Sequence, residues 1–232
     1  MIKVIKNIIK KLVFNKTMAN VMIKPLLKLH SLSYTLVGIL SNIKHEGDHP
    51  KHKIMQYQNW FTKNVKEDWT VLDVGCKTGI MPNTMSYKVN YVYGIEIVCK
   101  HIEEAKKINQ RDNIEFICAD ATSYDYSSSK SIDCITLSNV LEHIDERVEF
   151  LVDLSKNIKW KDKKRFLIRV PMIDREWIVL YKKDLGLEYR LDDTHFIEYT
   201  FEEFENELKE ANITIKSSFI KFGEIYAVCE GK

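Results

Sequence analysis

The stretch from Val71 to Gly79, VLDVGCKTG, constrains the fold more than any other part of this chain. Its apolar and β-branched residues predict a buried parallel strand, and its two glycines predict a turn where a ligand comes close to bare backbone. Ligands of open α/β sheets bind at the carboxyl ends of the strands. We therefore expect a ligand site directly after this strand.

From Thr70 onward the chain alternates short apolar runs with stretches of helical periodicity. This alternation indicates βαβ units and an α/β fold with a doubly wound, Rossmann-like, mostly parallel sheet. The last two strands share a short turn at Gly223 and must pair antiparallel, as a terminal hairpin. The sequence thus predicts a seven-stranded sheet, with strands at 70–74, 91–97, 114–118, 132–138, 165–170, 213–220 and 224–229. Helices are expected near 25–40, 51–66, 80–88, 99–109, 144–158 and 201–211.

Residues 1–66 are expected to form an N-terminal helical extension before a main domain at 67–232, which has a substrate-side insertion at about 171–199. Within residues 1–16, apolar residues recur at helical spacing between lysines, which is typical of a basic amphipathic helix. Two interpretations stay open. The apolar face packs on the domain or on the second subunit of a homodimer, or the helix docks on anionic lipid headgroups.

Charge is distributed unevenly along the chain. Eight of the 35 basic residues and none of the 33 acidic ones lie in residues 1–45, which leaves 27 basic against 33 acidic residues. A net acidic body argues against a nucleic-acid partner. No apolar stretch is long enough to span a bilayer, and no signal peptide is evident. We therefore expect a cytoplasmic protein, with peripheral membrane contact through residues 1–16 as an alternative.

The five cysteines are odd in number and contain no C-x-x-C pair. This pattern predicts reduced thiols and an intracellular compartment, and it argues against a zinc site. His45, His49 and His52 lie in a polar loop without cysteines or clustered carboxylates. We therefore expect no metal in this protein.

The spacing after the first strand discriminates between cofactors. A dinucleotide fingerprint needs G-x-G-x-x-G, but Lys77 and Ile80 occupy its second and third glycine positions. A P-loop needs a lysine after its last glycine, where this chain has Ile80. The remaining pattern, D-x-G-x-x-x-G, suits a ligand that presents an amino acid and a nucleoside.

Two further acids end the second and third predicted strands. Glu96 lies 23 residues beyond Asp73, where a carboxylate can accept both hydroxyls of a ribose. The alternative for Glu96 is a solvated acid at a strand end. Asp120 is placed to bind an adenine amino group, or else to cap a turn.

These motifs together resemble a known family. They are VLDVGCKTG, Glu96, Asp120-Ala121, IDCITLSNVLEHI at 132–144, LIRVP at 167–171, DDTHFIEYT at 192–200 and, before the core, HPKH at 49–52. In this order they resemble class I S-adenosylmethionine-dependent methyltransferases over about residues 68–232, and most of all the small-molecule type with a similar S-N-V-L-E-H. The resemblance implies S-adenosylmethionine as cofactor, a small-molecule or glycan acceptor, and a weaker association with surface-glycan biosynthesis.

The resemblance also implies roles for single residues. It assigns the methionine end of the cofactor to the first turn, the ribose to Glu96 and the adenine to the segment after the third strand, with Asn139 near the reacting methyl group. The implied cofactor-binding residues are Asp73, Gly75, Cys76, Gly79, Glu96, Asp120, Ala121 and Asn139. Lys77 departs from the family, which most often has glycine there. A positive φ at Lys77 would cost on the order of 1 kcal/mol.

Methyl transfer to a hydroxyl requires alignment of the acceptor and removal of a proton. By residue type, His195 and His143 are the candidate bases, with a slight preference for His195. The alternatives are that His195 and Asp193 hold their loop together, and that His143 braces the helix starting at Ile144.

The predicted insertion carries candidate acceptor ligands. Arg169, Arg175 and Arg190 suit a phosphate or carboxylate, unless they pair with nearby acids. Trp177 suits a sugar ring, unless it packs with Tyr181, Tyr189 and Phe196 as local core. Two other function classes compete: a nicotinamide-dependent oxidoreductase, against which the missing glycines argue, and a non-catalytic methyltransferase-like binding protein.

Overall fold

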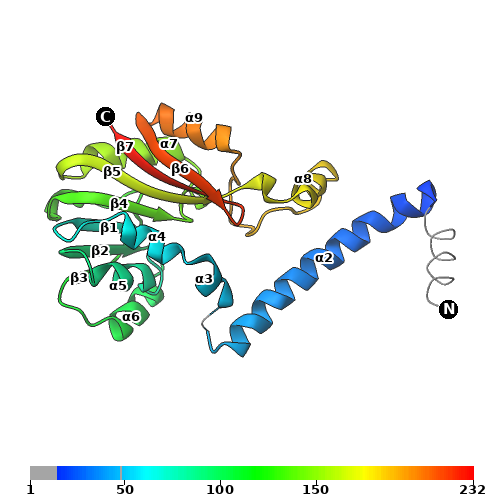
Figure 1. Cartoon of the computed structure of the whole chain (residues 1–232), viewed down its shortest axis with the longest axis horizontal. Coiled ribbons are helices and arrows are strands. Elements are labelled where there is room, and N and C mark those ends of the chain that lie inside the picture. Colours follow the sequence, from blue (N-terminus) through cyan, green and yellow to red (C-terminus); the bar gives the residue numbers. More distant parts are fainter. Residues whose placement is uncertain (1–14, 48) are drawn as a thin grey trace. The chain divides into compact units, whose positions relative to one another are not determined.

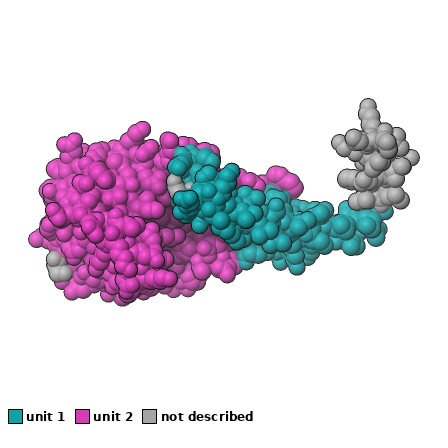
Figure 2. All heavy atoms as spheres, turned by 90° about the horizontal axis from the view of Figure 1, so that it is seen from below, with its two compact units in different colours: residues 1–55, 178–189 teal, residues 56–177, 190–232 magenta. Residues whose placement is uncertain are grey.

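The computed structural model describes residues 15–47 and 49–232. The predicted basic helix at residues 1–16 therefore lies almost entirely outside the described residues. The chain divides into two compact units (Figure 2), residues 1–55 with 178–189 and residues 56–177 with 190–232. The boundary expected after residue 66 stays a prediction.

The second unit is built on a seven-stranded sheet, which confirms the predicted fold (Figure 1). The strand order is β3-β2-β1-β4-β5-β7-β6, and β7 runs antiparallel to both β5 and β6. The other neighbouring strands pair in parallel. The strands are β1 (Thr70–Val74), β2 (Tyr91–Glu96), β3 (Ile114–Cys118), β4 (Ile132–Ser138), β5 (Trp160–Pro171), β6 (Ile213–Lys221) and β7 (Glu224–Gly231).

The helices of the second unit follow the predicted alternation. They are α4 (Tyr57–Lys63), α5 (Ile80–Ser86), α6 (Cys99–Ile108), α7 (Arg147–Asn157) and α9 (Phe201–Glu210), with short 3₁₀ turns at η1 (Tyr126–Ser128), η2 (Leu141–His143) and η3 (Ile173–Arg175). The helix α8 (Trp177–Asp184) continues from this unit into the first. In α9 a capping box fixes the start, because Thr200 and Glu203 each bond the other's backbone N–H.

Alternation along β1 sends its side chains to the two faces of the sheet. Leu72 and Val74 pack in a cluster with residues of α7 and α9, whereas Val71 packs with Phe61 of α4 and Met85 of α5. All five β1 residues are buried. Burying an aliphatic or aromatic side chain stabilises the fold by about 1.5–3 kcal/mol. The strand that ends at the expected ligand site is therefore fixed on both faces.

Two helical predictions are corrected. The helix expected at 51–66 is two helices, α3 (Pro50–Met55) and α4, because Gln56 has a left-handed φ of 51° that interrupts the helical hydrogen bonds. The helix expected after Pro25 is α2 (Lys16–Lys44), which runs through the proline. Pro25 lacks only one N–H donor. Among the described residues, no helix has the length and apolarity needed to cross a membrane.

The prediction of reduced thiols is wrong for two cysteines. Cys99 and Cys118 form a disulfide, with their Cα atoms 5.1 Å apart. Parallel pairing places Glu96 opposite Cys118, so the start of α6 comes within bonding reach of the end of β3. The other three cysteines, Cys76, Cys134 and Cys229, are free and buried.

Candidate functional site

The loop after β1 folds back over the end of β2. The N–H groups of Gly75 and Cys76 both donate to the carbonyl of Ile95, at 2.9 and 3.1 Å. The backbone then takes positive φ at Gly75 (69°), Lys77 (47°) and Gly79 (79°). Lys77 therefore has the left-handed backbone conformation, which is unfavourable for a residue with a side chain.

Gly79 is required by space as well as by its backbone angle. A Cβ atom at this position would lie 2.6 Å from the ring of Phe116. Gly79 also immediately precedes α5, so the loop leads directly from β1 into a helix. The close approach to Phe116 brings the loop against β3.

Glu96 connects the two loops at this edge of the sheet. Its side chain is 7% exposed, so it is not a solvated acid. One carboxylate oxygen accepts from the N–H of Lys77 at 3.1 Å, and the other accepts from the N–H of Val98 at 3.0 Å. His101 lies 3.8 Å from the same group. The carboxylate thereby orders the loops that follow β1 and β2.

Asp73 lies inside the sheet. Its carboxylate accepts from the hydroxyl of Thr136 on the neighbouring strand β4, at 2.5 Å. Burial raises the pKa of Asp73 to about 7, and the Thr136 hydrogen bond opposes that rise. Asp73 is therefore a titrating group near neutral pH, directly before the glycine loop.

The ends of β3 and β4 complete the same edge. Asp120 is exposed, and its Oδ1 accepts from the N–H and the hydroxyl of Thr122 at 2.9 and 2.8 Å, which makes it a turn cap. Ala121 is half-buried beside it. Asn139 has a positive φ of 55°, and its buried Oδ1 has no hydrogen-bond partner among the described residues.

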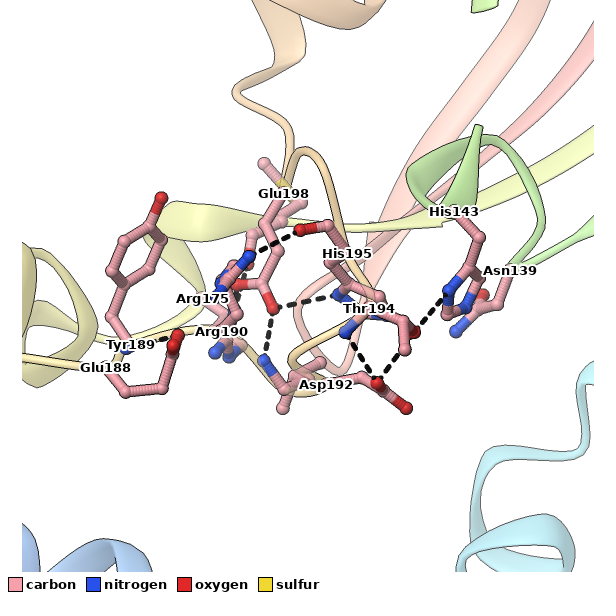
Figure 3. Close-up of polar contacts among 12 residues, drawn as sticks. Asn139, His143, Arg175, Glu188, Tyr189, Arg190, Asp192, Thr194, His195 and Glu198 are labelled. Carbon is pink, nitrogen blue, oxygen red and sulfur yellow. Dashed lines mark hydrogen bonds and ion pairs between the residues drawn. The ribbon is translucent and has the colours of Figure 1, made fainter. Parts of the chain in front are cut away.

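The two candidate histidines lie together, although 52 positions separate them in the chain. Their ring centroids are 4.6 Å apart. His143 is exposed and contacts Thr194, whereas His195 is buried and contacts Glu198 (Figure 3). The N–H of Phe196 donates to the carbonyl of Glu142 at 2.7 Å, which joins the two loops. Partial burial of its ring, and then the neighbouring His195, lowers the pKa of His143.

The three arginines make contacts within the protein. Arg169 is buried, and its Nη1 lies 3.3 Å from Glu224. Arg175 pairs with Glu198 and donates to the carbonyl of Met172. Arg190 donates to the carbonyl of His195 at 2.8 Å. Of the aromatic candidates, Trp177 is 74% exposed and Phe196 is 60% exposed, so neither is local core.

Comparison with known proteins finds matches to methyltransferases. Residues 72–159 match the family model described as a methyltransferase domain. The ubiquinone biosynthesis O-methyltransferase of Rickettsia bellii is 28% identical over 94 residues, which are 40% of this chain and 39% of that protein. The chain thus matches about two fifths of that relative's length.

Solved structures share the fold. A SAM-dependent methyltransferase from Aquifex aeolicus aligns with a TM-score of 0.57 and 20% identity, covering 82% of this chain and 96% of that one. The magnesium protoporphyrin IX methyltransferase of Synechocystis, solved with bound SAH, aligns with a TM-score of 0.58 and 16% identity, covering 78% of this chain and 83% of that one. Residues 72–159 thus match a methyltransferase domain, and the seven-stranded sheet has the fold of S-adenosylmethionine-dependent methyltransferases. The match and the fold support S-adenosylmethionine as the cofactor.

The residues at the carboxyl ends of the strands fit S-adenosylmethionine. A glycine loop with three positive φ angles brings backbone to the edge where the strands end, and a buried carboxylate closes β2 beside it. Asp73, Gly75, Cys76, Gly79 and Glu96 all lie at this edge. Their individual contacts to the cofactor stay predictions.

Several residues that shape this site were not assigned a role from the sequence. They are Glu142, Glu198 and Glu224, together with Thr136. All four are buried polar residues within otherwise apolar or mixed runs. Thr136, Glu142 and Glu198 stand in the motifs at 132–144 and 192–200, whereas Glu224 lies outside the motifs.

Proposed function

We propose that this protein transfers a methyl group from S-adenosylmethionine to a hydroxyl of a small molecule or glycan. The observation that carries the proposal is the buried Glu96, whose two oxygens accept from Lys77 and Val98 where the cofactor loops meet. The similarity to an O-methyltransferase of ubiquinone biosynthesis supports oxygen as the accepting atom.

In this proposal the cofactor is held by Asp73, Gly75, Cys76 and Gly79 at its methionine end, by Glu96 at the ribose, and by Asp120 and Ala121 at the adenine. Asn139 lies near the methyl group. The acceptor side comprises the histidine pair, His195 and His143, with Arg169, Arg175, Arg190 and Trp177 around it. Each guanidinium group has five N–H donors, and the proposed contacts to the acceptor come in addition to the internal contacts that the arginines already make.

The proposal places the protein in the cytoplasm, in a glycan or small-molecule pathway and without a nucleic-acid partner. Membrane contact through residues 1–16 and a homodimer belong to the same proposal. The exposed apolar residues of α2 support a role in association for the first unit, because Leu29, Val37, Leu40 and Ile43 are each more than half exposed.

The test is mass spectrometry of cell extracts incubated with the protein and S-adenosylmethionine that carries a deuterated methyl group. We expect a single labelled product class whose fragmentation places the methyl group on oxygen. The Glu96→Ala variant is the matched control and should give little product. A product methylated only on nitrogen or carbon would contradict the choice of acceptor, and the absence of any labelled product in a range of extracts would contradict methyl transfer.

A further inference from the structure

Glu142 is a buried carboxyl group with an unexplained environment. Its side chain is 0% exposed, and neither of its oxygens has a hydrogen-bond partner among the described residues. Burying a polar group without a partner costs several kcal/mol, and burying an unpaired charge costs more. A buried carboxyl group of this kind calls for a partner that the described residues do not supply.

The hydrogen bonds of His143 fix which ring nitrogen carries its proton. The hydroxyl of Thr194 donates its only hydrogen to Asp192 at 2.7 Å. Its contact with Nδ1 of His143, at 2.8 Å, must therefore be one in which the ring donates. In the neutral imidazole this leaves Nε2 of His143 with a lone pair.

His195 is fixed in the same way by a different partner. Its Nδ1 lies 3.2 Å from a carboxylate oxygen of Glu198, which can only accept. The same side chain accepts from the N–H of Leu191 and pairs with Arg175. Because Nδ1 of His195 donates to this carboxylate, Nε2 retains a lone pair in the neutral imidazole.

These three side chains converge. One donor atom each from Glu142, His143 and His195 lies within 4.8 Å of the other two. The bond between the N–H of Phe196 and the carbonyl of Glu142 holds the two loops in this arrangement. A ring nitrogen that donates to a carboxylate or to another oxygen, while its partner nitrogen stays free, is the arrangement that orients metal-binding histidines.

We propose that Glu142, His143 and His195 bind one divalent transition-metal ion. Two imidazoles and one carboxylate are the ligand set that suits Zn²⁺ and Co²⁺ with an open position for a further ligand, whereas Mg²⁺ and Ca²⁺ require oxygen ligands. Metal–ligand distances of about 2.0–2.2 Å need a small contraction of the cluster. Of the three residues, His143 is the exposed one. This proposal replaces the expectation of no metal.

The ion would occupy the same lone pairs that a histidine base needs, so the two roles exclude each other. The test is titration of chelator-treated, full-length protein with Co²⁺, followed by visible absorption and calorimetry. We expect one Co²⁺ per chain and d–d absorption bands. The variants Glu142→Gln, His143→Ala and His195→Ala should each weaken binding at least 10-fold. Thr194→Val removes the hydroxyl that accepts from His143 and donates to Asp192, and it should weaken Co²⁺ binding about 10- to 100-fold.

The exposed His45 provides the matched control, because His45→Ala removes a histidine outside the cluster and should bind Co²⁺ like the wild type. Binding of S-adenosylhomocysteine shows which variants are folded, and it separates this proposal from the proposed function. Wild-type protein that binds S-adenosylhomocysteine but takes up no stoichiometric Co²⁺ would overturn the metal site. The same conclusion would follow if all three ligand variants bound Co²⁺ unchanged.

Discussion

Replacing Glu96 with alanine tests the cofactor site at its most connected residue. The substitution removes the acceptor of two backbone N–H groups, those of Lys77 at 3.1 Å and Val98 at 3.0 Å, and it removes the proposed ribose ligand. A hydrogen bond to a charged group is worth about 1.5–3 kcal/mol. Because the side chain is only 7% exposed, solvent screens it little. Loss of the ribose contact alone should weaken S-adenosylhomocysteine binding about 10- to 150-fold.

Calorimetry with S-adenosylhomocysteine measures this loss, and thermal unfolding measures the separate effect on the loops. Glu96→Gln keeps one acceptor oxygen and should fall between the wild type and Glu96→Ala. Glu103→Ala removes an exposed acid of α6 and should bind like the wild type. An unchanged dissociation constant in a folded Glu96→Ala protein would show that another acid binds the ribose.

Three further outcomes are expected. Burial raises the pKa of Asp73 to about 7 from 3.8. The contribution of this group to the free energy of unfolding is therefore fully present below about pH 4 and is lost as the pH rises through 7. In urea unfolding, the Asp73→Asn variant should not show this loss. Lys77→Gly relieves the strain of a positive φ of 47°, but it also raises the conformational entropy of the unfolded chain. The free energy of unfolding should therefore rise by about 0–1 kcal/mol. A decrease of more than about 1 kcal/mol would contradict strain at Lys77. Breaking the disulfide with Cys118→Ser should lower the free energy of unfolding by about 3 kcal/mol under oxidising conditions. Addition of a reductant should lower the free energy of unfolding of the wild type only.

Strands β1, β3 and β4 were predicted to the residue, and β2 ends one residue earlier than predicted. In β1 and β4 the reason is that a strand covered on both faces of the sheet needs a largely apolar sequence. The first half of β5 was missed. Residues 161–164 are charged and mostly exposed, so they form no apolar run even though they are extended.

On the acceptor side, the sequence indicates candidate residues by their type, but it does not indicate their contacts. His143 and His195 were singled out because histidine titrates near neutrality, and the structure brings their rings together. Their partners Thr194 and Glu198 were not predicted, since neither the contact of His143 with Thr194 across two loops nor the contact of His195 with Glu198 within one loop leaves a periodic pattern. The Cys99–Cys118 disulfide was hidden for the same reason, because 19 positions separate two cysteines that only strand pairing brings together.

The most direct test of the central claim is calorimetric titration of the full-length protein with S-adenosylhomocysteine, with NADH as the comparison ligand. The geometry of the β1 loop and Glu96 predicts one binding event per chain, displaced by S-adenosylmethionine, and none with NADH. Binding of NADH, or no heat with S-adenosylhomocysteine at millimolar concentration, would contradict the assignment of this edge of the sheet to S-adenosylmethionine.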